Sequence, residues 1–112
     1  MGASKQMRSA KLGIVLQVTE VTRRGNDGRS WVVHDVERNR GFRVNLPTPA
    51  LQEVPAGEKA REWTEEDLRG AIGVAIERFL LASPELVAGP LYEVEVTSRD
   101  LHDFAKLGRA SG

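Results

Sequence analysis

The chain has no cysteine among its 112 residues. This absence excludes a disulfide scaffold, a thiolate metal site and a cysteine nucleophile, and it is the usage expected in a reducing compartment. Long apolar runs are missing as well. One of the longest, Ile14-Val15-Leu16, is far shorter than a membrane span or the core of a signal peptide. We therefore expect a soluble, cytoplasmic protein that does not enter a membrane.

Recognisable catalytic and cofactor motifs are also absent. The turn Gly25-Asn26-Asp27-Gly28 has no adjoining Lys-Ser/Thr pair and leads into a strand pattern, so it does not resemble a phosphate-binding loop. The acids at 65–67 lie in the first turn of a predicted helix, where the helix dipole favours negative charge. We expect no cofactor, and the sequence favours a protein that is not an enzyme.

Histidine is scarce, and its two occurrences do not form a metal site. His34 and His102 are each followed by an aspartate. Adjacent residues of a strand point to opposite faces, so His34 and Asp35 cannot readily share a metal ion. We expect His34 to face the core, His102-Asp103 to be an exposed pair on a helix, and neither histidine to bind a metal.

The composition is that of one globular domain, with 40% hydrophobic and 29% charged residues. The net charge of zero hides an asymmetry, because residues 1–48 carry nine basic and four acidic residues whereas residues 49–112 carry seven and twelve. Halves of +5 and −5 can steer a polyanion to the basic end or favour pairing with a second copy. They are also compatible with two ordinary solvated surfaces.

Two hexapeptides give complete start signals for helices. Residues 63–68 (WTEEDL) and 96–101 (VTSRDL) both read apolar–Thr–x–x–Asp–Leu, in which Thr caps the helix and Asp bonds back to the cap amide. They predict helices over about 65–82 and 98–107. Gly70 and Gly73 inside the first helix each cost about 1 kcal/mol relative to Ala. Two such costs indicate a close backbone contact, which we expect to be with the protein's own sheet.

Strand patterns occupy 14–22, 31–37, 42–46 and 91–96, so the predicted order is β-β-β-α-β-α. We expect an α+β domain with a mainly antiparallel sheet of three or four strands and both helices packed on one face. The proline-rich segment 47–63 forms the long connection, which is usually functional or mobile at such a length. In this interpretation, residues 1–11 are a flexible arm, residues 12–107 the domain and residues 108–112 a frayed end.

The orientation of the strand at 31–37 depends on the length of the turn that follows it. A three-residue loop at 39–41, with Gly41 as the left-handed residue, sets Val36 opposite Val44. A loop shorter by one residue would turn every side chain to the other face. We favour the three-residue loop. With this loop, the inward face of the hairpin contains Val32, His34, Val36, Phe42, Val44 and Leu46. Its outward face contains Trp31, Val33, Arg43 and Asn45, joined by Val15 and Val21 where the strand at 14–22 pairs alongside.

The outward face of this first hairpin is the candidate binding surface, through Trp31, Val33, Arg43 and Arg23. An apolar centre with a basic rim is typical of protein interfaces, in which Trp and Arg are enriched. We expect a small binding or regulatory module that contacts another protein or a second copy of itself. The alternatives are an RNA- or DNA-binding accessory protein that uses the basic first half, and an enzyme with a site near 47–63. A further possibility is that the segment 47–63 covers Trp31.

Overall fold

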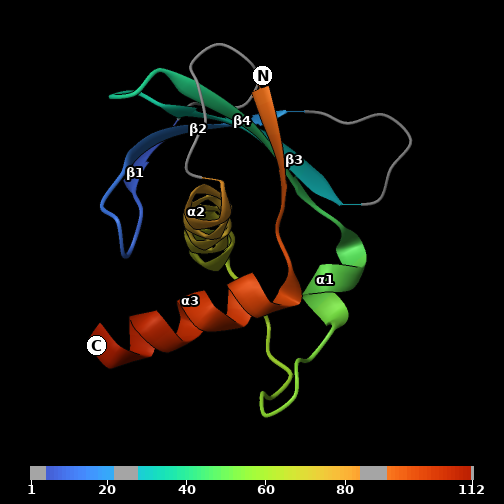
Figure 1. The fold of residues 1–112 in the computed structure, drawn as a ribbon. Helices are drawn as coiled ribbons and strands as arrows, with labels where there is room; N and C mark the ends of the chain where they lie inside the picture. Colours follow the sequence, from blue (N-terminus) through green and yellow to red (C-terminus); the bar gives the residue numbers. More distant parts are fainter. Residues whose placement is uncertain (1–4, 22–27, 84–90, 112) are drawn as a thin grey trace.

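A five-stranded sheet and three helices make up the fold of the computed structural model, which describes residues 5–21, 28–83 and 91–111, with side chains up to Leu107 (Figure 1). The predicted α+β class is confirmed. The elements are β1 (Lys5–Arg8), β2 (Val15–Val21), β3 (Arg29–Asp35), β4 (Arg40–Leu46), α1 (Thr48–Gln52), α2 (Glu65–Ala82), β5 (Leu91–Glu95) and α3 (Ser98–Ser111). Across these residues, none of the helices has the length and apolarity needed to cross a bilayer.

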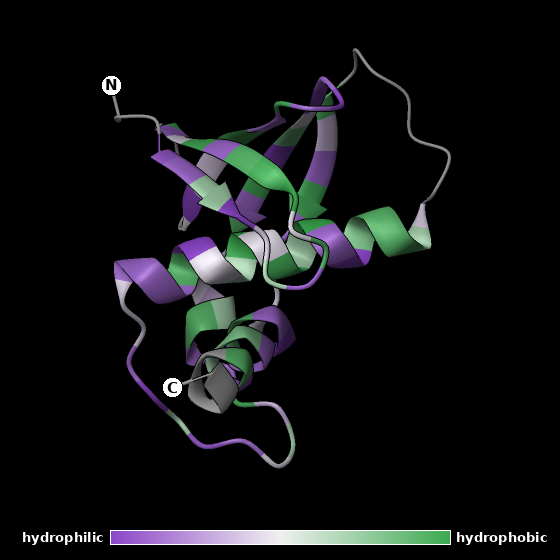
Figure 2. Ribbon diagram, turned by 90° about the vertical axis from the view of Figure 1, so that its left-hand side faces the viewer, coloured by the Kyte–Doolittle hydropathy of each residue, from purple (hydrophilic) through white to green (hydrophobic). Residues whose placement is uncertain are grey.

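The sheet has the strand order β1-β2-β3-β4-β5, antiparallel throughout except for the parallel pair β4 and β5. This corrects the predicted three or four strands. The parallel pair requires a crossover, and α2 supplies it between β4 and β5. Figures 1 and 2 show α2 directly below the sheet and α3 below α2, which gives three layers. Because α2 is packed on both sides, most of its circumference is buried.

The N-terminal segment is a strand where a flexible arm was predicted. β1 pairs with β2 in the register Lys5↔Val18 to Arg8↔Val15. Ser9 closes the turn between them, because its amide donates to the Ile14 carbonyl at 2.9 Å and its hydroxyl accepts from the Ile14 amide at 2.9 Å. A polar strand of this kind has almost no hydrophobic pattern. At the other end, α3 extends to Ser111, beyond the predicted end of that helix and into the segment predicted to fray.

Both predicted helix starts are confirmed, each with a complete capping box. Thr64 Oγ1 accepts from the Asp67 amide at 3.1 Å, and Asp67 Oδ2 accepts from the Thr64 amide at 3.0 Å. At the second start, the corresponding distances between Thr97 and Asp100 are 3.2 and 2.9 Å. The signal works because it is local, as donors and acceptors lie within four residues of one another.

The two glycines of α2, three residues apart, mark close contacts with two different elements. A Cβ at Gly70 would lie 2.2–2.3 Å from ring atoms of Phe104, so Gly70 is the point at which α3 crosses α2. A Cβ at Gly73 would lie 3.1 Å from Met7 Cε and 3.6 Å from Ser9 Cα, on the side of β1. The predicted contact with the sheet therefore holds for Gly73, whereas Gly70 contacts a helix.

The turn between β3 and β4 has four residues, 36–39, and the predicted three-residue loop is wrong. The register pairs Asp35 with Arg40 and Val33 with Phe42, and Asn39 is the left-handed residue with φ 52°. Asp35 organises this turn, because its carboxylate accepts from the Arg38 amide at 3.2 Å and from Arg40 Nη2 at 2.8 Å. Because the turn is one residue longer than predicted, the side chains of β3 point to the opposite faces from those predicted.

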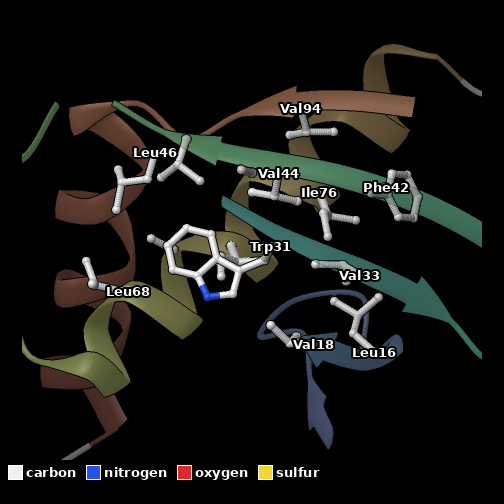
Figure 3. Close-up of a cluster of buried hydrophobic side chains, with 14 of the residues drawn as sticks. Leu16, Val18, Trp31, Val33, Phe42, Val44, Leu46, Leu68, Ile76 and Val94 are labelled. Carbon is white, nitrogen blue, oxygen red and sulfur yellow. The ribbon is translucent and has the colours of Figure 1, made fainter. Parts of the chain in front are cut away.

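The reversal places Trp31 and Val33 in the core. Trp31 is 3% exposed and Val33 is fully buried, whereas Val36, predicted to face inward, is 48% exposed. Figure 3 shows the Trp31 ring in the cluster of buried side chains between the sheet and α2. The faces predicted for β4 were correct. Its inward side chains form the centre of this cluster together with residues of β2, α2, β5 and α3: Leu16, Val18, Phe42, Val44, Leu46, Leu68, Ile72, Ile76, Val94 and Leu101.

Candidate functional site

The outer face of the sheet is the side directed away from α2. No described helix lies on that side in either view of the fold (Figures 1 and 2). The alternation of the strands and their register bring fourteen side chains of the five strands to this face. They are Gln6, Arg8, Val15, Gln17, Thr19, Val21, Ser30, Val32, His34, Arg43, Asn45, Leu91, Glu93 and Glu95.

Four of the fourteen side chains on this outer face are apolar. Val15, Val21 and Val32 are half-buried, and Leu91 is 48% exposed. Val36, just beyond the end of β3, continues the row that starts at Val15, because its amide donates to the Val15 carbonyl at 3.4 Å. Aliphatic residues that reach solvent from several neighbouring strands are a recognised mark of an interaction surface.

Arg43 is the cation at the centre of the outer face. It is exposed, lies between Val32 of β3 and Glu93 of β5 in the register, and forms no ion pair among the residues described. A guanidinium without an ion pair inside the chain is available to a carboxylate or an aromatic ring of a partner. The surface therefore combines several apolar side chains with a central cation, Arg43, and a second one on β1, Arg8.

Most of the other arginines of β3 and β4 are neutralised within the chain. Arg29 forms ion pairs of 2.7 Å with both Glu20 and Glu65, and its guanidinium lies 5.2 Å from the Trp31 ring centre. The hydrogen bond with Glu20, followed in effect by the one with Glu65, raises the pKa of Arg29. The bond between Arg29 and Glu20 also lowers the pKa of Glu20. Arg40 is paired with Asp35 in the same way.

The four predicted site residues are not brought together. Trp31 and Val33 are core residues and cannot contact a partner from their present positions. Arg43 is exposed on the outer face, as predicted, and Arg23 lies outside the described residues. His34, predicted to face the core, lies on the outer face, where its Nε2 is 3.1 Å from Asn39 Oδ1.

A second candidate site is the α2–α3 hollow, which lies between the C-terminal half of α2, α3 and the turn after β1. It has a volume of about 640 Å³, its apolar residues include Val74 and Leu81, and Leu81 is 71% exposed. The buried Glu77 carboxylate on its wall accepts from the amides of Lys11 at 2.8 Å and Leu12 at 2.6 Å. Asp100, which also lines this hollow, is paired with Arg78 at 3.0 Å. Both Glu77 and Asp100 therefore stabilise the fold.

The segment 53–64 is fixed to α3 by Glu58, an arrangement that the sequence did not predict. The Glu58 carboxylate forms an ion pair with Lys106, and Arg99 and His102 Nδ1 lie 3.9 and 3.6 Å from it. The hydrogen bond from Lys106 lowers the pKa of Glu58. His102, predicted to be exposed, is 3% exposed and packs edge-on against Trp63, with ring centres 4.9 Å apart.

Neither histidine belongs to a cluster of three potential metal ligands within the part of the chain that the structure describes. His34 is bonded to an amide side chain, and His102 lies beside one carboxylate surrounded by cations. Comparison of the chain with protein-family models, curated proteins and solved structures gives no match.

Proposed function

We propose that this chain is a small binding module that contacts another protein through the outer face of its sheet. One observation carries the proposal: this face is uncovered among the described elements although it presents Val32 and Leu91 around the uncommitted Arg43. Partly exposed aliphatic side chains gain free energy when a partner excludes water from them, at roughly 25 cal/mol per Å². A central arginine then provides specificity.

The charges support a protein partner more than a nucleic acid. Binding to a phosphate backbone requires several cations free to neutralise it. Arg29 and Arg40 are already paired with in-chain carboxylates, which leaves Arg8 and Arg43 as the two arginines of the outer face among the residues described. The buried acids Asp35 and Glu77 likewise have structural partners, which leaves them little freedom for acid–base chemistry.

A matched pair of leucines provides the test. Leu91 is on the outer face and Leu81 is on α2 beside the α2–α3 hollow, and both are exposed. We would immobilise wild type, Leu91→Asp, Arg43→Glu and Leu81→Asp, and compare the proteins captured from native lysate with and without nuclease. Thermal melts of each variant control for loss of folding.

The proposal predicts a protein that wild type and Leu81→Asp retain, that Leu91→Asp and Arg43→Glu lose, and that nuclease leaves bound. Loss with Leu81→Asp alone would move the surface to the α2–α3 side. Capture that disappears on nuclease treatment would support the nucleic-acid alternative instead. Either result would overturn the assignment of the outer face to protein contact.

A further inference from the structure

The two edges of the sheet carry opposite charges. β1 presents the exposed cations Lys5 and Arg8, and β5 presents the exposed acids Glu93 and Glu95. Among the residues described, none of these four side chains forms an ion pair; the Arg8 guanidinium donates only to the Gly13 carbonyl, at 3.1 Å. The asymmetry between the basic first half and the acidic second half of the chain is therefore expressed at the two ends of one sheet.

Each edge also has a side without a strand partner. Within the described ranges, β1 is hydrogen-bonded to β2 alone and β5 to β4 alone. An open hollow of about 310 Å³ lies against β1, lined by Gln6, Met7, Arg8 and Val15. Unpaired backbone groups along an edge strand are a template for pairing with another chain.

Charge decides which pairing is favourable. Two β1 edges would bring their Arg8 side chains onto the same face of the joined sheet, and two β5 edges would do the same with Glu93 and Glu95; like charges close together across a strand pair are destabilising. The combination of one β1 with one β5 places opposite charges together. We propose that β5 of one copy of this chain pairs with β1 of a second copy, which extends the sheet from one molecule into the next.

The side chains match on both faces in this arrangement. The strand directions make β5 and the added β1 antiparallel if the second sheet continues the first. A register that sets Met7 opposite Val94 then sets Arg8 opposite Glu93. Met7 lies on the inner face, where it extends the apolar row of β5, and the ion pair lies on the outer face.

The contact is heterologous, since it joins two different edges. An open assembly of this kind retains one free β1 at one end and one free β5 at the other, so growth ends only if the assembly closes into a ring. The edge backbones and the Arg8–Glu93 pair carry this contact, whereas Val32 of the central strand β3 does not take part in it. Self-association through the edges and binding of another protein on the face can therefore be tested separately.

A charge exchange tests the pairing. We would measure sedimentation of wild type, Arg8→Glu, Glu93→Arg and an equimolar mixture of the two variants over a range of concentration and salt. Each variant alone should associate about tenfold or more weakly than wild type, because like charges then face each other. The mixture should recover association, since each variant supplies the charge that the other requires. Added salt should weaken association of wild type and of the mixture.

Two controls make the result specific. Val32→Thr changes the outer face on the central strand β3, away from both edges, and should leave self-association unchanged, whereas it should weaken protein capture. Circular dichroism and thermal melts should show that Arg8→Glu and Glu93→Arg remain folded. Wild type that is monomeric at all concentrations would overturn the inference, as would a mixture no more associated than its components. Neither outcome would affect binding on the outer face.

Discussion

Gly70 offers the most direct test of how the helices pack. Replacing it with Ala places a methyl group where the ring of Phe104 now lies, at 2.2–2.3 Å from three ring atoms. Carbon atoms in contact are separated by about 3.5–4.0 Å. The ring must therefore move away from α2, and α3 loses part of its contact with that helix. Gly73 is a matched control in the same helix, because its added methyl would meet only the flexible end of Met7, at 3.1 Å.

Two opposing free-energy contributions set the change in stability caused by each Gly→Ala substitution. Ala is favoured over Gly within a helix by about 1 kcal/mol, and this gain applies equally at Gly70 and Gly73. Overpacking of a well-filled interface costs about 1–3 kcal/mol, and it applies at Gly70 because the ring is rigid. We expect Gly70→Ala to lower the free energy of unfolding by about 1 kcal/mol, and Gly73→Ala to leave it unchanged or raise it.

Urea unfolding and thermal melts would measure both variants. A loss of about 1 kcal/mol corresponds to roughly 4 °C in the melting temperature of a domain of this size. Phe104→Leu should remove the conflict, so that the double variant is more stable than the sum of the two single changes predicts. Gly70→Ala as stable as Gly73→Ala would refute the reasoning, because the contact with Phe104 would then have no energetic consequence.

Three further predictions concern individual side chains. Asp35→Ala should destabilise the domain by about 3 kcal/mol in denaturant unfolding, because the partly buried Arg40 guanidinium loses its fully buried carboxylate partner; a loss below about 1 kcal/mol would contradict this. Thr64→Ala and Thr97→Ala should each cost about 1 kcal/mol, and their sum should equal the loss in the double variant. The pKa of Glu58 is lowered from its ordinary 4.5, so its stabilising effect is complete above that value and is lost as the pH falls through the folded-state pKa. The melting-temperature difference between wild type and Glu58→Gln should therefore shrink in acid, and a difference independent of pH would exclude a role for that charge.

The sequence predicted the parts of the fold that depend on local chemistry. The starts of α2 and α3 follow from side chain–backbone bonds within four residues, and both were correct. The faces of β4 followed from its alternating apolar residues. β3 was reversed because a three-residue turn with Gly41 left-handed was expected, whereas the turn has four residues with Asn39 left-handed. The actual turn buries Asp35. Its burial depends on Arg40 across the hairpin, a pair that periodicity does not reveal.

The reversed orientation of β3 also explains why two of the predicted site residues are not at the surface. Reversal of β3 moved Trp31 and Val33 from the surface to the core, whereas Arg43, on the correctly oriented β4, stayed outside. β1 was missed because its polar residues show no pattern. The contact of Glu58 with α3 joins residues distant in sequence, and only the spacing of Arg99 and Lys106 along one helix hinted at it.

The buried Glu77 has a consequence for how the chain folds during synthesis. Its carboxylate accepts from the amides of Lys11 and Leu12, which precede it by 66 and 65 residues. The β1–β2 hairpin leaves the ribosome long before α2, so these amides are bonded to water until Glu77 emerges. The turn that follows β1 can thus acquire these two bonds only after α2 has been made. Nascent chains ending before α2 should exchange those amide hydrogens freely, and chains extending beyond it should retain them.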